Sequence, residues 1–96
     1  MEQQQEEFVR VRLPRRDEVL GEIEEILGGS RFKVLCTDGK KRICRIPGKF
    51  RKRVHVRVGD VILIKPWTVE ADEKGDVVWL YNKTQMSWLR RKGFVK

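Results

Sequence analysis

Apolar and polar residues alternate along several short stretches of the chain, which is the pattern of half-buried β-strands. Two of these stretches, residues 31–37 and 41–46, flank Asp38-Gly39, a strong signal for a hairpin turn. A three-residue loop with a left-handed glycine sets the apolar side chains of the first stretch opposite Cys44 and Ile46. A two-residue turn sets them opposite a face with two basic residues instead. We therefore predict the three-residue loop.

The alternation continues beyond the hairpin. It predicts three further strands, at residues 54–58, 61–65 and 76–81. Residues 17–29 are ambiguous, because their apolar positions fit one face of an amphipathic helix and also fit a strand with a bulge near Glu24-Glu25. Periodicity alone leaves both alternatives open.

The end of the chain has the pattern of a helix. Asn82 or Thr84 can cap a helix over residues 84–92, on which Met86 and Leu89 share one face, and a glycine follows it. Short strands at this spacing indicate a small all-β barrel. We expect three parts: a flexible N-terminal arm (1–18), the barrel (19–81), and a C-terminal helix packed on the barrel with a short tail (82–96).

The charge is unevenly distributed. The 96 residues include 22 Lys+Arg and 14 Asp+Glu, for a formal net charge of +8. From Gly39 to Gly59 there is no acidic residue but there are nine basic ones, which repel one another in a compact domain unless a polyanion neutralises them. This stretch predicts nucleic-acid binding.

Residues that could support other chemistry are few. Two cysteines without CxxC spacing and one histidine exclude a four-ligand zinc site, so we expect no metal and no cofactor. In the favoured register Cys36 and Cys44 lie roughly 13 Å apart, too far for a disulfide, and should be core residues. No carboxylate or nucleophile is placed to work with His55, so we do not expect an enzyme.

The sequence also bears on location. The longest apolar run, residues 61–64, is far shorter than the roughly 20 residues that span a bilayer. The acidic, polar N-terminus does not have the pattern of a secretory signal. We expect a cytoplasmic protein with no membrane contact.

A specific order of short strings carries a family resemblance. The strings are Gly28-Gly29-Ser30-Arg31-Phe32-Lys33-Val34, Asp38-Gly39-Lys40, Arg45-Ile46-Pro47-Gly48-Lys49, Lys52-Arg53-Val54 and Gly59-Asp60-Val61-Ile62-Leu63. Over about residues 10–93 the chain resembles the archaeal translation initiation factor 1A family, whose relatives include bacterial initiation factor 1. The resemblance implies a five-stranded OB-fold barrel of the S1-like type, with a short helix between strands 3 and 4. It also implies that residues 19–27 form strand 1.

The resemblance implies a function as well. Such a factor binds the small ribosomal subunit near the decoding A site through ribosomal RNA, promotes dissociation of ribosomes into subunits, and stabilises binding of initiator Met-tRNA. The expected partners are the small subunit, the initiator tRNA complex and other initiation factors, with the chain itself a monomer.

The expected RNA-binding residues come from the hairpin, the basic stretch after it and the end of the strand predicted at residues 61–65. They are Arg31, Lys33, Lys41, Arg42, Arg45, Lys49, Arg51, Lys52, Arg53, His55, Arg57, Lys65 and Trp67. Family members often have an aromatic residue at the position of His55. Trp67 can either stack on RNA or cover the barrel rim, whereas Trp79 and Tyr81 are expected to pack in the core or against the helix.

Two other functions remain as alternatives. One is a generic single-stranded RNA- or DNA-binding OB-fold protein of the cold-shock type, which would bind free oligonucleotides tightly. The other is an accessory domain of an enzyme that acts on tRNA. Preference for the isolated small subunit over free oligonucleotides distinguishes the initiation factor from the first alternative.

Overall fold

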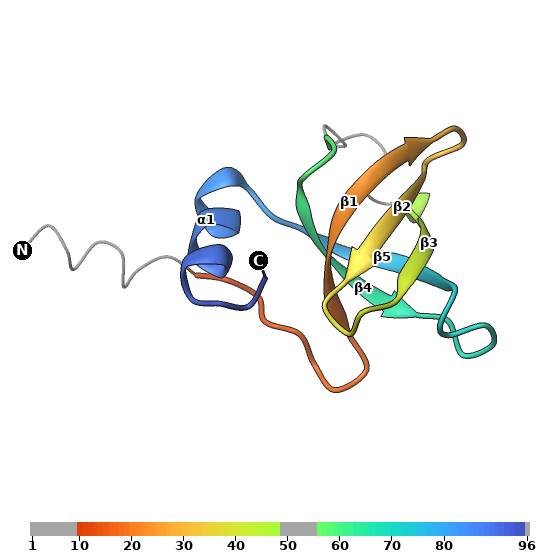
Figure 1. Ribbon diagram of the computed structural model, residues 1–96, viewed down its shortest axis with the longest axis horizontal. Helices are drawn as coiled ribbons and strands as arrows, with labels where there is room; N and C mark the ends of the chain where they lie inside the picture. Colours follow the sequence, from red (N-terminus) through yellow and green to blue (C-terminus); the bar gives the residue numbers. More distant parts are fainter. Residues whose placement is uncertain (1–9, 49–55, 96) are drawn as a thin grey trace, which may run out of the picture.

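Five strands form a closed barrel in the computed structural model, which describes residues 10–48 and 56–95 (Figure 1). The strands are β1 (Val19–Leu27), β2 (Arg31–Cys36), β3 (Lys41–Arg45), β4 (Val61–Pro66) and β5 (Lys74–Leu80). They pair in the order β1-β2-β3-β5-β4, and the helix α1 (Lys83–Arg91) lies beside one end of the barrel. The predicted OB-fold barrel with a C-terminal helix is confirmed. The short helix predicted between the third and fourth strands, at residues 49–53, lies outside the described residues.

The ambiguous segment forms β1, so the helical alternative is wrong. Its first half pairs with β4 and its second half with β2, and the register shifts between Ile23 and Glu25, where the sequence allowed a bulge. A strand is favoured because it pairs with two neighbours at once and closes the barrel. Gly21 permits this close approach, since a Cβ there would lie 2.4 Å from the Cγ1 atom of Val34.

The hairpin has the predicted three-residue loop. Phe32 pairs with Cys44, the Cys36 N–H donates to the Lys40 carbonyl (2.9 Å), and Gly39 has a φ of 88°. This is a left-handed glycine position. Cys36 and Cys44 are free and buried, as predicted, and burial raises the pKa of the Cys44 thiol to about 12.

The strand predicted at residues 54–58 is wrong in its described part. Residues 56–58 have no strand structure, and Val58 is 61% exposed. The chain turns here because the Asp60 carboxylate accepts from the Arg57 N–H (3.0 Å) and the Asp60 N–H donates to the Arg57 carbonyl (3.0 Å). Gly59, with a φ of 97°, completes the turn.

The apolar residues of β4 serve two cores. Ile62 and Ile64 face the barrel interior, where they pack with residues of the other strands, whereas Val61 and Leu63 face Leu89 of α1. Both faces of β4 are therefore buried, which explains its unbroken apolar run. The helix follows its predicted pattern: Asn82 and Gln85 form a capping box, and Gly93, with a φ of 83°, follows the helix end.

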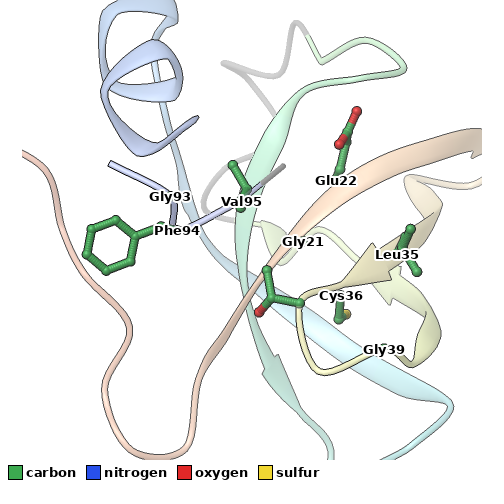
Figure 2. A pocket seen from close by; sticks show the side chains of 9 residues that line it. Gly21, Glu22, Leu35, Cys36, Gly39, Gly93, Phe94 and Val95 are labelled. Atoms are coloured by element: carbon green, nitrogen blue, oxygen red, sulfur yellow. The ribbon is translucent and has the colours of Figure 1, made fainter. Parts of the chain in front are cut away.

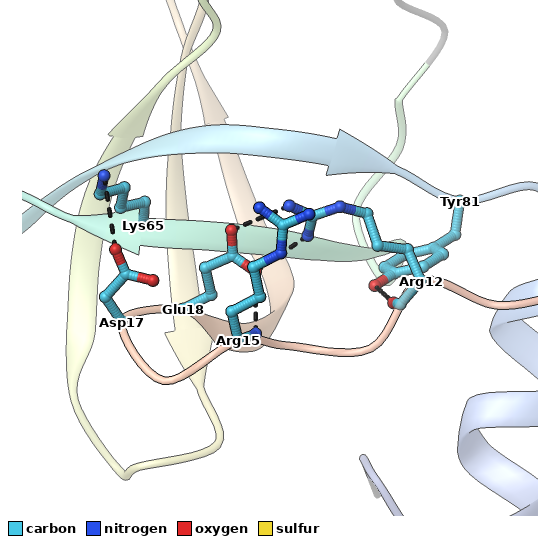
Figure 3. Close-up of polar contacts among 6 residues, drawn as sticks. All are labelled: Arg12, Arg15, Asp17, Glu18, Lys65 and Tyr81. Carbon is cyan, nitrogen blue, oxygen red and sulfur yellow. Dashed lines mark hydrogen bonds and ion pairs between the residues drawn. The ribbon is translucent and has the colours of Figure 1, made fainter.

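Residues 10–18 lie across the junction of barrel and helix without regular structure (Figure 3). The Tyr81 hydroxyl donates to the Arg12 carbonyl, and the Arg12 guanidinium donates twice to the Glu18 carboxylate, at 2.9 Å each. This bond to Arg12 holds the pKa of Glu18 below its ordinary value. The loose arm stays a prediction for residues 1–9, which lie outside the described residues.

One aromatic expectation is wrong. Tyr81 is buried as predicted, but Trp79 is 39% exposed and lies under the Arg12 guanidinium, 5.8 Å from the ring centroid. The register of β4 and β5 shifts between Leu63 and Ile64, which breaks the alternation that the sequence pattern assumed for β5.

Candidate nucleic-acid interface

The outer side of the hairpin gathers basic side chains from two strands. Arg31 pairs with Arg45, Lys33 with Ile43, and Leu35 with Lys41. The inner positions of these strands are buried, so the outer ones share one exposed side. We call the surface of Arg31, Lys33, Lys41 and Arg45 the hairpin face. Its composition agrees with the sequence prediction.

Ion pairs within the hairpin face are weak enough to exchange for a phosphate. The Lys41 ammonium lies 3.6 Å from the Glu24 carboxylate, and the Arg45 Nε atom lies 3.2 Å from an Asp76 oxygen. The side chains of both basic residues are more than half exposed. Exposed pairs of this kind contribute about 0–1 kcal/mol, so they do not compete strongly with a polyanion.

Arg42 was predicted to bind RNA, but the structure turns it inward. Its side chain is only 3% exposed, and its guanidinium forms two hydrogen bonds with the Asp38 carboxylate (2.9 and 3.2 Å). Its Nε atom donates to the Ala71 carbonyl at 2.6 Å. Arg42 follows the same parity as buried Cys44, so it belongs to the inner face and ties the hairpin turn to the loop before β5. We remove it from the candidate surface.

The ion pair shifts the titration of Asp38. The hydrogen bond from Arg42 holds the pKa of the Asp38 carboxyl below its ordinary value, against the smaller opposing effect of burial. Both groups therefore stay charged at neutral pH, and the pair fixes the turn between β2 and β3.

The parallel pairing of β3 with β5 extends the hairpin face. Asp76 lies beside Arg45, and Lys74 lies beside Ile43. The Trp67 ring lies over this extension: its Nε1 atom donates to Asp76 (3.0 Å), and the Arg45 guanidinium lies 5.3 Å from the ring centroid. The Lys74 ammonium lies 5.6 Å from the same centroid. A groove of about 470 Å³ runs here, lined by Arg45, Lys65, Pro66, Trp67, Thr68, Val69 and Asp76.

The structure places Lys65 and Trp67, two residues predicted to bind RNA, beside the hairpin face, and adds Lys74. Sequence reasoning missed Lys74 because it stands in an acidic stretch, and its neighbours become visible only once β3 and β5 pair in parallel. Lys65 carries an exposed ion pair with Asp17, at 3.4 Å (Figure 3).

The remaining predicted residues lie elsewhere. Arg57 is exposed in the turn before β4, where the Gly59 N–H donates to the Ile23 carbonyl, so it is not part of the hairpin face. Five predicted residues lie outside the described residues: Lys49, Arg51, Lys52, Arg53 and His55.

A second hollow, of about 530 Å³, lies between the barrel and the C-terminal segment (Figure 2). It is lined by Gly21, Glu22, Leu35, Cys36, Thr37, Gly39, Gly93, Phe94 and Val95. Its lining has one acidic residue, no basic one, and several apolar ones, so it lacks the charge that would attract a phosphate.

Comparison with known proteins decides the family. The model of the family described as translation initiation factor 1A / IF-1 matches residues 6–96. The chain belongs to this family. Its members are translation initiation factors, which act by binding and are not enzymes.

The chain is similar to its relatives along most of their length. It is 50% identical over 93 residues to translation initiation factor 1A of Methanothermobacter thermautotrophicus, covering 97% of this chain and 94% of the relative. It is 49% identical over 88 residues to the factor of the same name from Pyrococcus abyssi, covering 92% and 78%.

A solved structure agrees with the fold. The solution structure of bacterial translation initiation factor 1 from the Wolbachia endosymbiont of Brugia malayi is 25% identical, with a TM-score of 0.53. The match covers 70% of this chain and 79% of that one. In the described part of the initiation factor, no cluster of three or more side chains could hold a metal ion. None of its described helices is long and apolar enough to cross a membrane.

Proposed function

We propose that the chain binds the small ribosomal subunit near the decoding A site through ribosomal RNA. There it promotes dissociation of ribosomes into subunits and stabilises initiator Met-tRNA binding, as a cytoplasmic monomer that works with other initiation factors. Family membership supports the role in initiation, and the hairpin face supports RNA as the contact. That face is the single observation that carries the proposal.

The physical basis is electrostatic. Four basic side chains from two strands lie on one side of the barrel. Phosphates can replace the weak, exposed ion pairs of two of them, Lys41 and Arg45. Each phosphate contact releases counterions, so binding weakens as salt rises. We include in this proposal the basic residues between 49 and 57 that the sequence predicts to bind RNA.

The composition of the hairpin face favours structured ribosomal RNA over a free single strand. Binders of free strands usually present aromatic rings on which successive bases stack. On the described outer face of β2 and β3, the positions that are not basic are Leu35 and Ile43, and neither is aromatic. Phosphate contacts without stacking suit a target whose shape is already fixed.

The test is a binding measurement with matched variants. In the hairpin-face variant, Arg31, Lys33 and Lys41 become Gln. In the control variant, exposed Arg16, Lys83 and Lys92 become Gln, so each variant loses one Arg and two Lys. We expect the wild type to prefer isolated small subunits to a single-stranded RNA of equal concentration, and only the hairpin-face variant to lose that preference.

Two results would contradict the proposal. Tighter binding to free oligonucleotides than to small subunits would favour the cold-shock type of function. Equal losses in the two variants would mean that the total charge, rather than the hairpin face, governs binding.

A further inference from the structure

Three charged side chains surround one indole ring at the edge of the hairpin face. The Arg45 guanidinium and the Lys74 ammonium lie 5.3 and 5.6 Å from the centroid of the Trp67 ring. Asp76 accepts from the Trp67 Nε1 atom at 3.0 Å and from the Arg45 Nε atom at 3.2 Å. We call Arg45, Trp67, Lys74 and Asp76 the rim site. Three segments of the chain meet there.

The contacts argue against a stacked base on Trp67. A base that stacks needs a free ring face, and two cations already lie over this ring. Both cation–π contacts are attractive, so each opposes replacement of its cation by a base. A base that stacks on a ring face held by a cation must displace that cation, which then loses its contact with the ring.

We propose that Trp67 is a positioning residue: it holds Arg45 and Lys74 together as a binding site for one phosphate group of the bound RNA. This inference rests on the proposed function and gives one part of the RNA-binding surface a specific ligand. Trp67 acts on the phosphate through the two cations and does not read a base.

The donors that such a site needs are available. The Asp76 carboxylate accepts hydrogen bonds from the Nε and Nη2 atoms of Arg45, at 3.2 and 3.5 Å. The Nη1 atom of Arg45 can therefore donate to a phosphate oxygen. The Lys74 ammonium contributes up to three further donors. Asp76 repels an anion, but Arg45 and Lys74 together outweigh its charge, and its Oδ1 atom is already shared by Trp67 and Arg45.

The surroundings suit a phosphate in an RNA strand. Arg45, Trp67 and Asp76 line the groove of about 470 Å³, and Lys65 lies on the same groove. Volumes of this order accept a small ligand, so a phosphate with part of its sugar can enter. Lys65 adds a third positive charge, which its exposed pair with Asp17 at 3.4 Å neutralises only weakly.

The first test needs no RNA. In the NMR spectrum of the full chain, the ring current of Trp67 should shift the side-chain protons of Arg45 and Lys74 upfield. Trp67→Leu should abolish both shifts, whereas Trp67→Phe should keep most of each. Unshifted protons in the wild type would overturn the arrangement of the rim site.

The second test measures affinity against salt concentration, with isolated small subunits and with a uridine oligonucleotide as separate probes. Trp67→Leu should weaken binding about 3- to 10-fold and make the slope of log affinity against log salt shallower by about one. Lys74→Gln should do the same, and the double variant should lose little more, because both changes disable one site. Trp67→Phe should keep the wild-type slope.

The outcomes separate this inference from the proposed function. Two results together would show base stacking and overturn the inference, while leaving small-subunit binding intact. They are a loss of affinity in Trp67→Leu with an unchanged slope, and strong quenching of wild-type tryptophan fluorescence by RNA that Trp67→Leu abolishes. Absence of small-subunit binding, with the predicted slope change on the oligonucleotide, would overturn the proposed function and support the rim site.

Discussion

Arg42 and Arg45 lie three residues apart on β3, and one side chain is buried while the other is exposed. The Arg42 side chain is 3% exposed and forms a bidentate pair with Asp38 inside the hairpin turn. The Arg45 side chain is 54% exposed and pairs with Asp76 at the edge of the hairpin face. Strand parity separates them. The comparison teaches that a basic stretch is not a binding surface as a whole: one part holds the fold, and another stays exposed as the proposed RNA-binding surface.

The largest effect should come from breaking the buried side of this comparison. Arg42→Met removes the tie between the hairpin turn and Ala71. We expect a loss of about 2–3 kcal/mol in the free energy of unfolding, below the full range for a buried pair because Asp38 is partly exposed. Denaturant unfolding measures it, with Arg45→Met as the control, which should cost less than about 0.5 kcal/mol. RNA affinity of folded Arg42→Met should stay within about twofold of wild type; a large loss would return Arg42 to the binding surface.

The next largest effect should be the loss of RNA affinity when exposed residues of the hairpin face are changed. In the hairpin-face variant, affinity for the small subunit should fall about 10- to 100-fold, and the salt slope should become shallower by about two to three, because three phosphate contacts are removed. Stability should change by less than about 0.5 kcal/mol. A stability loss as large as that of Arg42→Met would mean that the three substituted basic residues stabilise the fold rather than bind RNA.

Lowering the pH should reduce the stabilisation that the buried Arg42 pair contributes. The pKa of Asp38 is held below its ordinary value in the folded state by Arg42, so the pair's stabilisation is present above the unfolded carboxyl pKa of about 4 and is lost as pH falls through the folded value. The difference in unfolding free energy between wild type and Arg42→Met should therefore shrink between about pH 5 and pH 2. A pH-independent difference would mean that Asp38 contributes nothing through its charge.

The smallest effect tests the other anchored carboxylate. Arg12 holds the pKa of Glu18 below its ordinary value, so Glu18→Gln should lower stability by about 1 kcal/mol at pH 7 and by less near pH 3. RNA affinity should not change, since this pair lies at the junction of barrel and helix. Thermal unfolding at the two pH values measures the effect, and a larger loss at pH 3 would contradict it.

Local signals predicted much of the fold. Asp38-Gly39 and the alternation around it fixed the hairpin register, because a turn of defined length leaves one pairing. The helix was predictable from its cap at Asn82 and the glycine after it. These features depend on residues close together in sequence.

The alternative left open at β1 and the errors elsewhere arose where distant residues decide the structure. β1 pairs on two sides with a bulge, so its pattern imitates a helix. The alternating valines before β4 imitate a strand, although the Asp60 carboxylate turns the chain there. Lys74 joins the site only through the parallel pairing of β3 and β5, which no local pattern reveals. Arg42 was misassigned because its charge was counted without its parity.

Chemical footprinting of small-subunit RNA tests the central claim most directly. The protein concentration is set so that wild-type protein and the control variant occupy the small subunit equally. Both should then protect the decoding-site RNA, and the hairpin-face variant should fail to protect it at the same concentration. Protection elsewhere on the subunit, or equal protection by the hairpin-face variant, would contradict the claim that the hairpin face binds ribosomal RNA at the A site.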